Sequence, residues 1–350
     1  MTTFVTAEAS LISYQLDAPV GGSGVGHVNL IVVDLVDSDG VSGMGFSYVL
    51  GASATIVLHA AREQLARFLA ARQILPPQAL WRQIHMSFNR TGLGPNVLAL
   101  AAIDVAAWDH AARRQRLPLA AAMGGVAHPV AVYGSGGFTA SQSPGEAARN
   151  AAVLAERGFR AVKPRVSGQP SSAALIAEVR RTVGDELGVM IDANEKCDAL
   201  SARRLISLAH EHGVLFVEEP LPAAALEGYR SLAAHSPVVI ATGEHLQGRS
   251  SFLPFIRDGM AGVIQPDLAM IGGLTPALEL CVLAESFGVA VAPHFLPGLF
   301  VHLAAVSPAV TWLEDFPLLE PLFEGWPVIS DGCMTPTDRI GHGLAVKRTR

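Results

Sequence analysis

Short apolar runs that end on an acid or a histidine recur along the second half of this 350-residue chain. Six of them follow one another: LGVMID, VLFVE, VVIATGE, AGVIQPD, VAVAPH and VTWLE, which end at Asp192, Glu218, Glu244, Asp267, His294 and Glu314. Successive ends lie 20 to 27 residues apart, which is the length that one strand and one helix require. Repetition of this unit predicts a parallel α/β barrel whose strand ends meet on one face.

Helical periodicity fills the intervals between these runs. The predicted helices of the barrel span residues 144–157, 171–183, 199–212, 223–234, 249–258, 274–287 and 299–306. Two earlier runs predict the first barrel strands: PVAVYGSGG begins at Pro129, and FRAVKPR carries Lys163 and Arg165 near its end. We therefore expect the barrel to occupy residues 126–318.

The N-terminal part of the chain has a different pattern. Residues 8–18 alternate between apolar and polar, and residues 27–49 predict a hairpin. Helical patterns follow at 53–73, 77–88 and 95–115. Three strands followed by three helices predict an α+β capping domain over residues 1–125. The turn-rich C-terminal tail, residues 319–350, is expected to pack back on this domain.

The composition narrows the class of protein. Half of the residues are hydrophobic and the net charge is −6, so we expect neither a nucleic-acid partner nor a membrane partner. The three cysteines are odd in number and far apart, which favours a reducing compartment, and we expect a cytoplasmic protein without a signal peptide. The most apolar long stretch, Val97 to Ala107, contains Asp104 and is too short to span a bilayer.

Three carboxylates end consecutive predicted strands: Asp192, Glu218 and Glu244. Neighbouring barrel strands lie about 5 Å apart, and carboxylates that close repel one another unless a cation lies between them. Oxygen ligands suit a hard cation such as Mg²⁺. A single such residue is better explained as a polar loop residue, but three in consecutive strands predict a metal site.

The remaining strand ends carry acid–base chemistry. Lys163 and Arg165 lie two residues apart on one predicted strand, so both can face the pocket. An aspartate near a histidine fixes the histidine tautomer and supports its protonated form, so Asp267 and His294 predict a general base. His294 alone would be better explained as a hydrogen-bonded loop histidine.

Other motifs are better explained by structure than by function. The segment Gly22 to Gly26 resembles a nucleotide-binding loop, but a predicted strand follows it where such a loop requires a helix. His210 and His212 have the spacing of a metal motif, yet they lie at a predicted helix end just before Gly213. No nucleophile elbow is present in the sequence.

At these positions the sequence resembles the enolase superfamily, and specifically its mandelate racemase subgroup. The resemblance covers essentially the whole chain. Its motifs are Ala102-Ile103-Asp104 with Trp108-Asp109, Met123-Gly124-Gly125, Asp192-Ala193-Asn194, Val217-Glu218-Glu219-Pro220, Gly243-Glu244, Pro266-Asp267 with Gly272-Gly273, and Pro293-His294.

The resemblance implies a modified (β/α)₇β TIM-like barrel with an N-terminal α+β capping domain. It also implies Mg²⁺ bound by Asp192, Glu218 and Glu244, and a small carboxylate substrate whose α-proton is removed to give an enediolate. The Asp267–His294 pair resembles the base of the subgroup. Related members are usually dimers or octamers, so a homo-oligomer is expected.

The resemblance assigns roles to four further residues. Lys163 resembles the first lysine of a Lys-x-Lys motif that holds the substrate carboxylate. Glu314 resembles a hydrogen-bond donor to that carboxylate, and would therefore have to be protonated. Asn194 and Glu219 resemble residues that support the metal site.

One position departs from the pattern of the subgroup. The second lysine of the motif, a base in the racemase, is Arg165 here, and arginine is a poor base because it keeps its proton. We therefore favour dehydration of an acid sugar (an aldonate or aldarate) to a 2-keto-3-deoxy acid, which His294 can catalyse alone as base and then acid. The alternatives are a 2-hydroxy-acid racemase or epimerase in which Arg165 is deprotonated, and a catalytically silent barrel that binds an acid sugar.

Substrate specificity is expected to lie in the Ala18–His27 loop, in Tyr48 and near the Phe295–Phe300 loop. The glycine-rich segment 18–27 contains Gly22, Ser23 and His27. Tyr48 ends the predicted hairpin nearby in sequence, and we expect these residues to contact the substrate.

Overall fold

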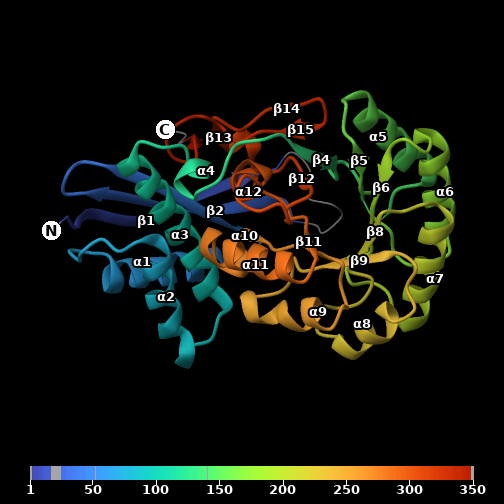
Figure 1. Ribbon diagram of the computed structural model, residues 1–350, viewed down its shortest axis with the longest axis horizontal. Helices are drawn as coiled ribbons and strands as arrows, with labels where there is room; N and C mark the ends of the chain where they lie inside the picture. Colours follow the sequence, from blue (N-terminus) through green and yellow to red (C-terminus); the bar gives the residue numbers. More distant parts are fainter. Residues whose placement is uncertain (1, 17–24, 52, 140, 348–350) are drawn as a thin grey trace.

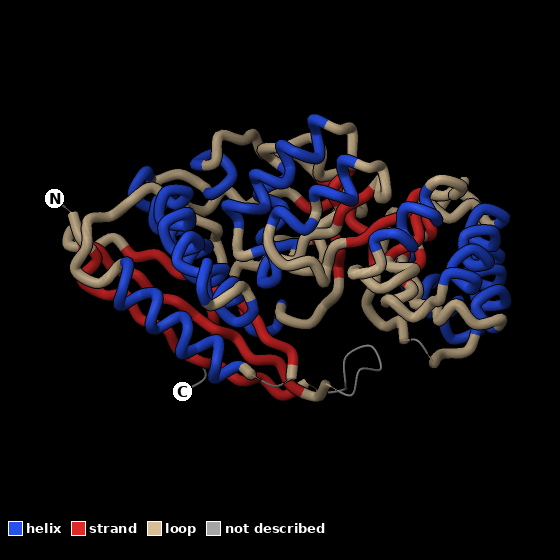
Figure 2. Tube along the Cα trace, turned by 90° about the horizontal axis from the view of Figure 1, so that it is seen from below, coloured by secondary structure: helices blue, strands red, loops and turns tan. Residues whose placement is uncertain are grey.

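An antiparallel sheet begins the chain. The computed structural model describes residues 2–16, 25–51, 53–139 and 141–347. Strands β1 (Phe4–Gln15), β2 (His27–Asp37) and β3 (Ser42–Leu50) form a sheet in that order. Helices α1 (Ala54–Phe68), α2 (Pro77–Met86) and α3 (Gly94–Gln115) follow, and Figure 2 shows helices packed along the long strands. The expected α+β arrangement of this part is confirmed.

Strand β2 is buried on both faces, and its side chains alternate between two cores. Ile31 and Val33 pack with the helices α1 to α3. Leu30 and Val32 point the other way and belong to the core that continues into the barrel. This period of two is that of a strand with both faces covered. The sheet is therefore a layer between its own helices and the barrel.

Helix α3 approaches strand β3 closely because Gly45 has no side chain. A Cβ atom at Gly45 would lie 2.2 Å from the backbone nitrogen of Ala106, a distance that no larger residue tolerates. The close approach brings Leu98 of α3 and Leu50 of β3 to the same opening, where both line one pocket.

Parallel strands form the second part of the molecule. They are β4 (Val130–Gly134), β5 (Ala161–Val162), β6 (Gly188–Val189), β7 (Ile191–Asp192), β8 (Phe216–Glu218), β9 (Val239–Thr242), β10 (Val263–Ile264), β11 (Ala290–Val291) and β12 (Leu313–Asp315). β6 and β7 are two halves of one predicted strand, and they pair with β5 and β8 respectively. β12 pairs with β4, and a bridge between Val291 and Val310 joins β11 to the segment before β12, so the ring closes.

Helices lie outside the strands, as Figure 1 shows for the arc from α5 to α9. The helices that follow the barrel strands are α5 (Pro144–Glu156), α6 (Ser171–Val183), α7 (Ala199–Glu211), α8 (Leu226–Ala233), α9 (Leu253–Arg257), α11 (Leu274–Ser286) and α12 (Pro297–Ala304). The inside of the ring is filled mainly by Tyr133, Met190, Phe216 and Val263. The architecture confirms the expected modified (β/α)₇β barrel. Among the described residues, no helix is both long and apolar enough to cross a membrane.

The structure adds short elements that the hydrophobic pattern did not predict. Helix α10 (Leu268–Ile271) begins directly after Asp267, whose Oδ1 accepts hydrogen bonds from the backbone nitrogens of Ala269 and Met270. A four-residue helix has no hydrophobic period to detect, so only its N-cap is visible in the sequence. The other short helices are α4 (Leu119–Ala122), η2 (Ser87–Arg90) and η4 (Glu320–Leu322), while η3 (Arg249–Ser251) lies at the start of the predicted helix 249–258.

Buried polar contacts join the capping helices to the barrel. Asp104 of α3 accepts hydrogen bonds of 2.7 Å from both the backbone nitrogen and the hydroxyl of Thr275, at the start of α11. Trp108 donates to the same hydroxyl at 3.0 Å. Burial raises the pKa of Asp104 to about 7, although the bonds from Thr275 oppose the rise. The motif around Asp104 and Trp108 is thus explained by docking of the two parts.

The C-terminal segment returns to the N-terminal part. The short strands here are β13 (Phe323–Glu324), β14 (Ile329–Ser330), β15 (Cys333–Met334) and β16 (Ala345–Val346). The backbone nitrogen of His342 donates to Asp109 of α3 at 3.0 Å, and its ring contacts the carbonyl of Met44 in β3 at 2.7 Å. These contacts support the division that we propose, with a cap (1–125), a barrel (126–318) and a returning tail (319–350).

Candidate active site

Three buried or nearly buried carboxylates stand at neighbouring strand ends. Asp192 and Glu218 are the last residues of β7 and β8 and pair in register. Glu244 follows the end of β9 at Thr242. Asp192 and Glu218 are almost fully buried, whereas the side chain of Glu244 keeps 13% of its exposure and lines the pocket. The structure therefore brings the three predicted metal ligands to one end of the barrel.

The two carboxylate oxygens of Glu218 have different surroundings. Its Oε2 accepts hydrogen bonds from Lys163 Nζ at 2.5 Å and from Gln265 Nε2 at 2.6 Å. Its Oε1 is buried and has no hydrogen-bond partner among the described residues. Burial raises the pKa of Glu218 well above its usual value, and Asp192 and Glu244 add to the rise while Lys163 opposes it. A buried oxygen without a donor suits a cation ligand.

A second acidic cluster lies beside these carboxylates. Glu195, Glu219 and His245 each offer one possible metal-ligand atom, and these atoms lie within 4.8 Å of one another. Within the described ranges, this is the group of side chains close enough together to hold a metal ion as they stand. His245 Nδ1 lies 2.9 Å from Glu219 Oε2. The hydrogen bond to Glu219 raises the pKa of His245 to about 9, and burial raises that of Glu219 to about 7. Asp192, Glu218 and Glu244 do not form so tight a group.

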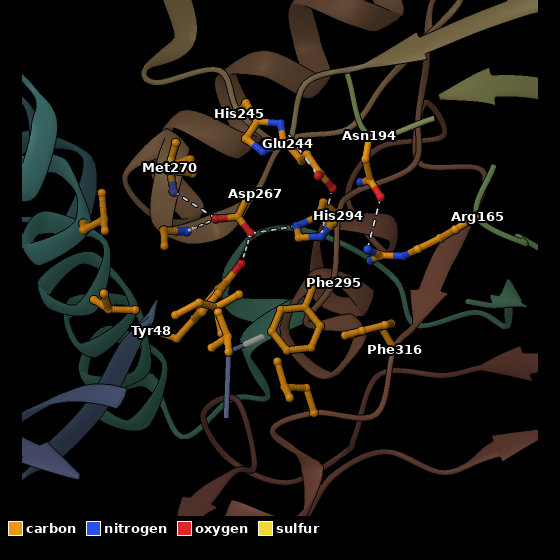
Figure 3. Close-up of a pocket in the computed structure, with 16 residues that line it drawn as sticks. Tyr48, Arg165, Asn194, Glu244, His245, Asp267, Met270, His294, Phe295 and Phe316 are labelled. Atoms are coloured by element: carbon orange, nitrogen blue, oxygen red, sulfur yellow. Dashed lines mark hydrogen bonds and ion pairs between the residues drawn. The ribbon is translucent and has the colours of Figure 1, made fainter. Parts of the chain in front are cut away.

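The predicted aspartate–histidine pair is formed. His294 Nδ1 lies 3.0 Å from Asp267 Oδ2, and its Nε2 lies 3.0 Å from Glu244 Oε2 (Figure 3). Burial alone would lower the pKa of His294, but the negative charges of Glu244, Glu314 and Asp267 outweigh burial and raise it to about 10. Because Nδ1 is hydrogen-bonded to Asp267, Nε2 is the ring nitrogen that can exchange a proton with another group.

Asp267 is held by the cap as well as by the barrel. Its Oδ1 accepts the two backbone bonds that begin α10, and its Oδ2 accepts a hydrogen bond from the hydroxyl of Tyr48 in β3. The Tyr48 ring also packs edge-on against Phe295, with ring centroids 5.2 Å apart. We expected Tyr48 only as a substrate contact, and its bond to Asp267 was not predicted.

Lys163 bridges two buried carboxylates. Its Nζ lies 2.5 Å from Glu218 and 2.8 Å from Glu314. Burial would raise the pKa of Glu314, but Lys163 and His294 lower it to about 2. Glu314 Oε2 also accepts the backbone hydrogen of Phe295 at 2.9 Å. A cation and a backbone donor favour the carboxylate form of Glu314 in this arrangement. The protonated form that the resemblance implies stays a prediction for the substrate complex.

Arg165 lines the pocket next to Asn194. Its Nη1 donates to Asn194 Oδ1 at 3.1 Å, and its guanidinium lies 5.7 Å from the centre of the Phe316 ring. In the view of Figure 3, Arg165 and Asp267 lie on either side of His294. Asn194 is fixed in turn, because its backbone nitrogen donates to Asp192 at 2.8 Å.

Left-handed backbone follows several of these residues. Asn194, Glu219, Phe295 and Leu296 have φ angles of 42°, 38°, 58° and 49°. Such angles cost energy in residues with a side chain and cluster at functional sites. The backbone thus turns sharply directly after these strand ends.

The pocket between cap and barrel has a volume of about 420 Å³. Its lining includes Tyr48, Arg165, Glu244, Asp267 and His294. Four other candidates, Lys163, Asp192, Glu218 and Glu314, are buried behind this lining. His27 is exposed at the start of β2 and does not line the pocket, so its predicted contact is not supported. Gly22 and Ser23 lie outside the described residues.

Sequence reasoning missed several residues of the site. Gln265, which binds Glu218, lies two residues before Asp267 and hence on the same side of the chain. That spacing was a usable signal. His245 follows Glu244 directly and binds Glu219, and Phe316 lies two residues after Glu314 and lines the pocket. Neither has a chemical pattern that separates it from ordinary loop residues.

The pocket lies between a capping sheet and the strand ends of a closed barrel, and it contains a histidine that is hydrogen-bonded to an aspartate. This arrangement is typical of a barrel enzyme that uses acid–base chemistry. The chain belongs to the mandelate racemase / muconate lactonizing enzyme family of the enolase superfamily. Residues 10–124 match the N-terminal domain of that family, and residues 146–350 match the enolase C-terminal domain-like family. The resemblance seen in the sequence is confirmed.

Several similar proteins are named as dehydratases. The chain is 33% identical over 327 residues to L-talarate/galactarate dehydratase of Salmonella typhimurium, covering 91% of this chain and 81% of that protein. The crystal structure of L-talarate dehydratase from Polaromonas sp. JS666, complexed with Mg and L-glucarate, matches with a TM-score of 0.91 and 32% identity, covering 99% and 96% of the two chains. A racemase from Streptomyces coelicolor A3(2) with bound magnesium matches with a TM-score of 0.92 and 27% identity, covering 98% and 97%.

Proposed function

We propose that this protein is a Mg²⁺-dependent acid-sugar dehydratase, a hydro-lyase that converts an aldonate or aldarate to a 2-keto-3-deoxy acid. The relatives named as dehydratases of L-talarate/galactarate and of D-gluconate support the reaction class. For this chain the proposal rests on the difference between two pocket residues. His294 is hydrogen-bonded to Asp267 and can act as a base, whereas Arg165 is hydrogen-bonded to Asn194 and is a poor base.

The donor set fits a divalent cation. Asp192, Glu218 and Glu244 would hold Mg²⁺, and the unpartnered Oε1 of buried Glu218 supports this assignment. When bound, the ion supplies a Lewis acid toward the substrate carboxylate. Glu219 and Asn194 would orient this region, because Glu219 fixes His245 beside Glu244 and Asn194 is bonded to Asp192.

His294 would carry the proton in both halves of the reaction. With Glu244 bound to a cation, less negative charge would remain to raise the pKa of His294, which favours its neutral form. Neutral His294 would then remove the proton from C2 of the substrate and become an imidazolium that Asp267 stabilises. The imidazolium then returns this proton to the hydroxyl of C3, which leaves as water. The electron pair of the C2–H bond becomes the C2–C3 double bond, and the resulting enol converts to the 2-keto-3-deoxy acid.

The cationic side chains would bind the substrate rather than act as bases. Lys163, held between Glu218 and Glu314, offers positive charge to the substrate carboxylate. Arg165 has five donors and no acceptor, so it would clamp an oxygen of the substrate while Asn194 holds its direction. With Glu314 as a carboxylate, its place in this scheme is to hold Lys163 and the backbone of Phe295.

A screen of aldonates and aldarates tests the proposed function. The enzyme with Mg²⁺ should form a 2-keto product from at least one acid, and the product should disappear in excess chelator. Exchange of the α-proton without a keto product would favour the racemase. Neither exchange nor product from any acid would favour a silent acid-sugar-binding barrel.

The proposal extends to the setting of the enzyme. We place it in the cytoplasm as a homo-oligomer, a dimer or an octamer. The three cysteines Cys197, Cys281 and Cys333 are free thiols, in keeping with a reducing compartment. Light scattering coupled to gel filtration tests the oligomer, and a monomer of 36.7 kDa would contradict it.

A further inference from the structure

The cap side of the pocket is apolar apart from Tyr48, whose hydroxyl is bonded to Asp267. The other polar lining residues, including Arg165, Glu244 and His294, follow the ends of barrel strands, where Phe295 and Phe316 also line the pocket. Val49 and Leu50 at the end of β3, Leu98 of α3, and Met270 of α10 form another wall, which we call the apolar wall. Figure 3 shows the polar residues gathered around His294.

The pocket cations are all bound at the barrel end. Arg165 donates to Asn194, His245 contacts Glu219, and His294 lies between Asp267 and Glu244. No lysine, arginine or histidine belongs to the apolar wall, as far as the described lining extends.

The direction of the substrate follows from the proposed function. The reacting carboxylate and C2 must lie near Lys163 and His294, because these supply the charge and the base. The rest of the carbon chain then extends toward the cap and meets the apolar wall. A second carboxylate placed there would lose its water without gaining a cation, which is strongly unfavourable. A terminal methyl group would instead bury apolar surface.

We infer that the substrate is a monocarboxylic acid sugar with a deoxygenated far end, such as a 6-deoxyhexonate, and that hexarates are rejected. This inference rests on the proposed function, and it sets this chain apart from the L-talarate/galactarate dehydratase that it resembles. The relative acts on acids with a carboxylate at each end, whereas the apolar wall offers such a group no partner.

Matched sets of substrates test the inference. Each set contains a 6-deoxyhexonate, a hexonate and a hexarate that share the configuration of C2 to C5, and kcat/KM is measured for every acid with Mg²⁺. In the set that reacts best, the 6-deoxyhexonate should exceed the hexarate by at least about 100-fold, as expected when a charged group lacks its partner. Equal or higher kcat/KM for the hexarate would overturn the inference.

A pair of variants at Leu98 tests the apolar wall itself. Leu98→Arg places a cation there, and should raise the ratio of hexarate to 6-deoxyhexonate kcat/KM at least about ten-fold. Leu98→Gln introduces a polar side chain without charge, and its ratio should stay as low as that of the wild type. An arginine variant that folds, by circular dichroism, with an unchanged ratio would contradict the assigned position of the far end.

The failures of the two proposals can be told apart. If no acid in any set gives product or α-proton exchange, the proposed function fails. If acids are dehydrated but hexarates are preferred by the wild-type enzyme, the dehydratase stands and only the substrate class is wrong.

Discussion

At the scale of single residues, Glu218 shows how this barrel prepares a cation site. One oxygen is fixed by Lys163 and Gln265, and the other has no donor among the described residues. Burial of a carboxylate is costly unless both oxygens have partners. A cation at this oxygen would satisfy it, which is the physical basis for assigning Glu218 to the metal.

Glu218→Gln should therefore weaken Mg²⁺ binding and activity together. An amide keeps the size of the side chain but removes the charge that a hard cation requires, so we expect at least about a ten-fold rise in the Mg²⁺ concentration for half-maximal activity. The control is Glu227→Gln, at an exposed glutamate on α8. Full activity of Glu218→Gln in excess chelator would remove Mg²⁺ from the account.

A second prediction at this scale concerns His302, which is fully buried in α12. Burial, with the charge of His342, lowers the pKa of His302 from 6.5 to about 4. The unfolded chain therefore binds a proton here below pH 6.5 that the folded protein takes up only near pH 4. Stability should fall as the pH decreases through this window.

His302→Leu removes this proton uptake. The variant should lose less stability than the wild type between pH 7 and pH 4, by up to about 3 kcal/mol, since one pKa unit corresponds to about 1.4 kcal/mol. Denaturant unfolding at both pH values measures the difference, with His235→Leu at an exposed histidine as control. An identical loss in the His302 variant and the wild type would show that His302 is not acid-sensitive.

At the scale of elements, the Asp267–His294 pair depends on three segments that are distant in sequence. The loop after β10 supplies Asp267, the loop after β11 supplies His294, and β3 of the cap supplies Tyr48. Helix α10 fixes the other oxygen of Asp267 through two backbone bonds. The orientation of the imidazole is thus set by both the cap and the barrel.

Tyr48→Phe tests whether the cap positions the base. The phenyl ring keeps the packing against Phe295 but loses the bond to Asp267, so kcat should fall about ten-fold while KM stays within about two-fold. Tyr14→Phe, in β1 away from the pocket lining, should change neither constant. A purely structural role of Tyr48 would instead lower the melting temperature and leave kcat of the folded enzyme unchanged.

At the scale of the whole molecule, the cap and barrel behave as interlocked layers. One face of the capping sheet packs on its helices and the other on the barrel core. Asp104, Trp108 and Thr275 add a buried polar contact between them. Because the pocket lies between the two parts, this docking also sets the distance from Tyr48 to Asp267.

Thr275→Val should weaken the docking. It removes the hydroxyl that donates to Asp104 and accepts from Trp108, and each buried group that loses a partner costs about 1–3 kcal/mol. We expect a loss of about 2 kcal/mol and a melting temperature lower by a few degrees. Calorimetry compares it with Thr311→Val at an exposed threonine. An unchanged melting temperature would show that the contact does not stabilise the protein.

The sequence was sufficient for the barrel and for the residues at its strand ends. Asp192, Glu218, Asp267 and His294 could be predicted because a parallel barrel brings every strand end to one face. The bond from Tyr48 to Asp267 could not, since it joins residues 219 positions apart through the docking of two domains. The contact between Lys163 and Glu314 could not be predicted for a similar reason, because no spacing in the sequence reveals the distance between these two side chains.

The exchange of α-protons with D₂O tests the central claim, that His294 is the single base. For a confirmed substrate, proton NMR would follow the C2 proton of both C2 epimers with the wild type and with His294→Asn, which keeps a polar edge without the basic ring. The account predicts exchange and water loss for one epimer in the wild type, and neither for any epimer in the variant. Exchange of both epimers by the wild type, with one retained in His294→Asn, would show a second base at or near Arg165 and would favour a racemase.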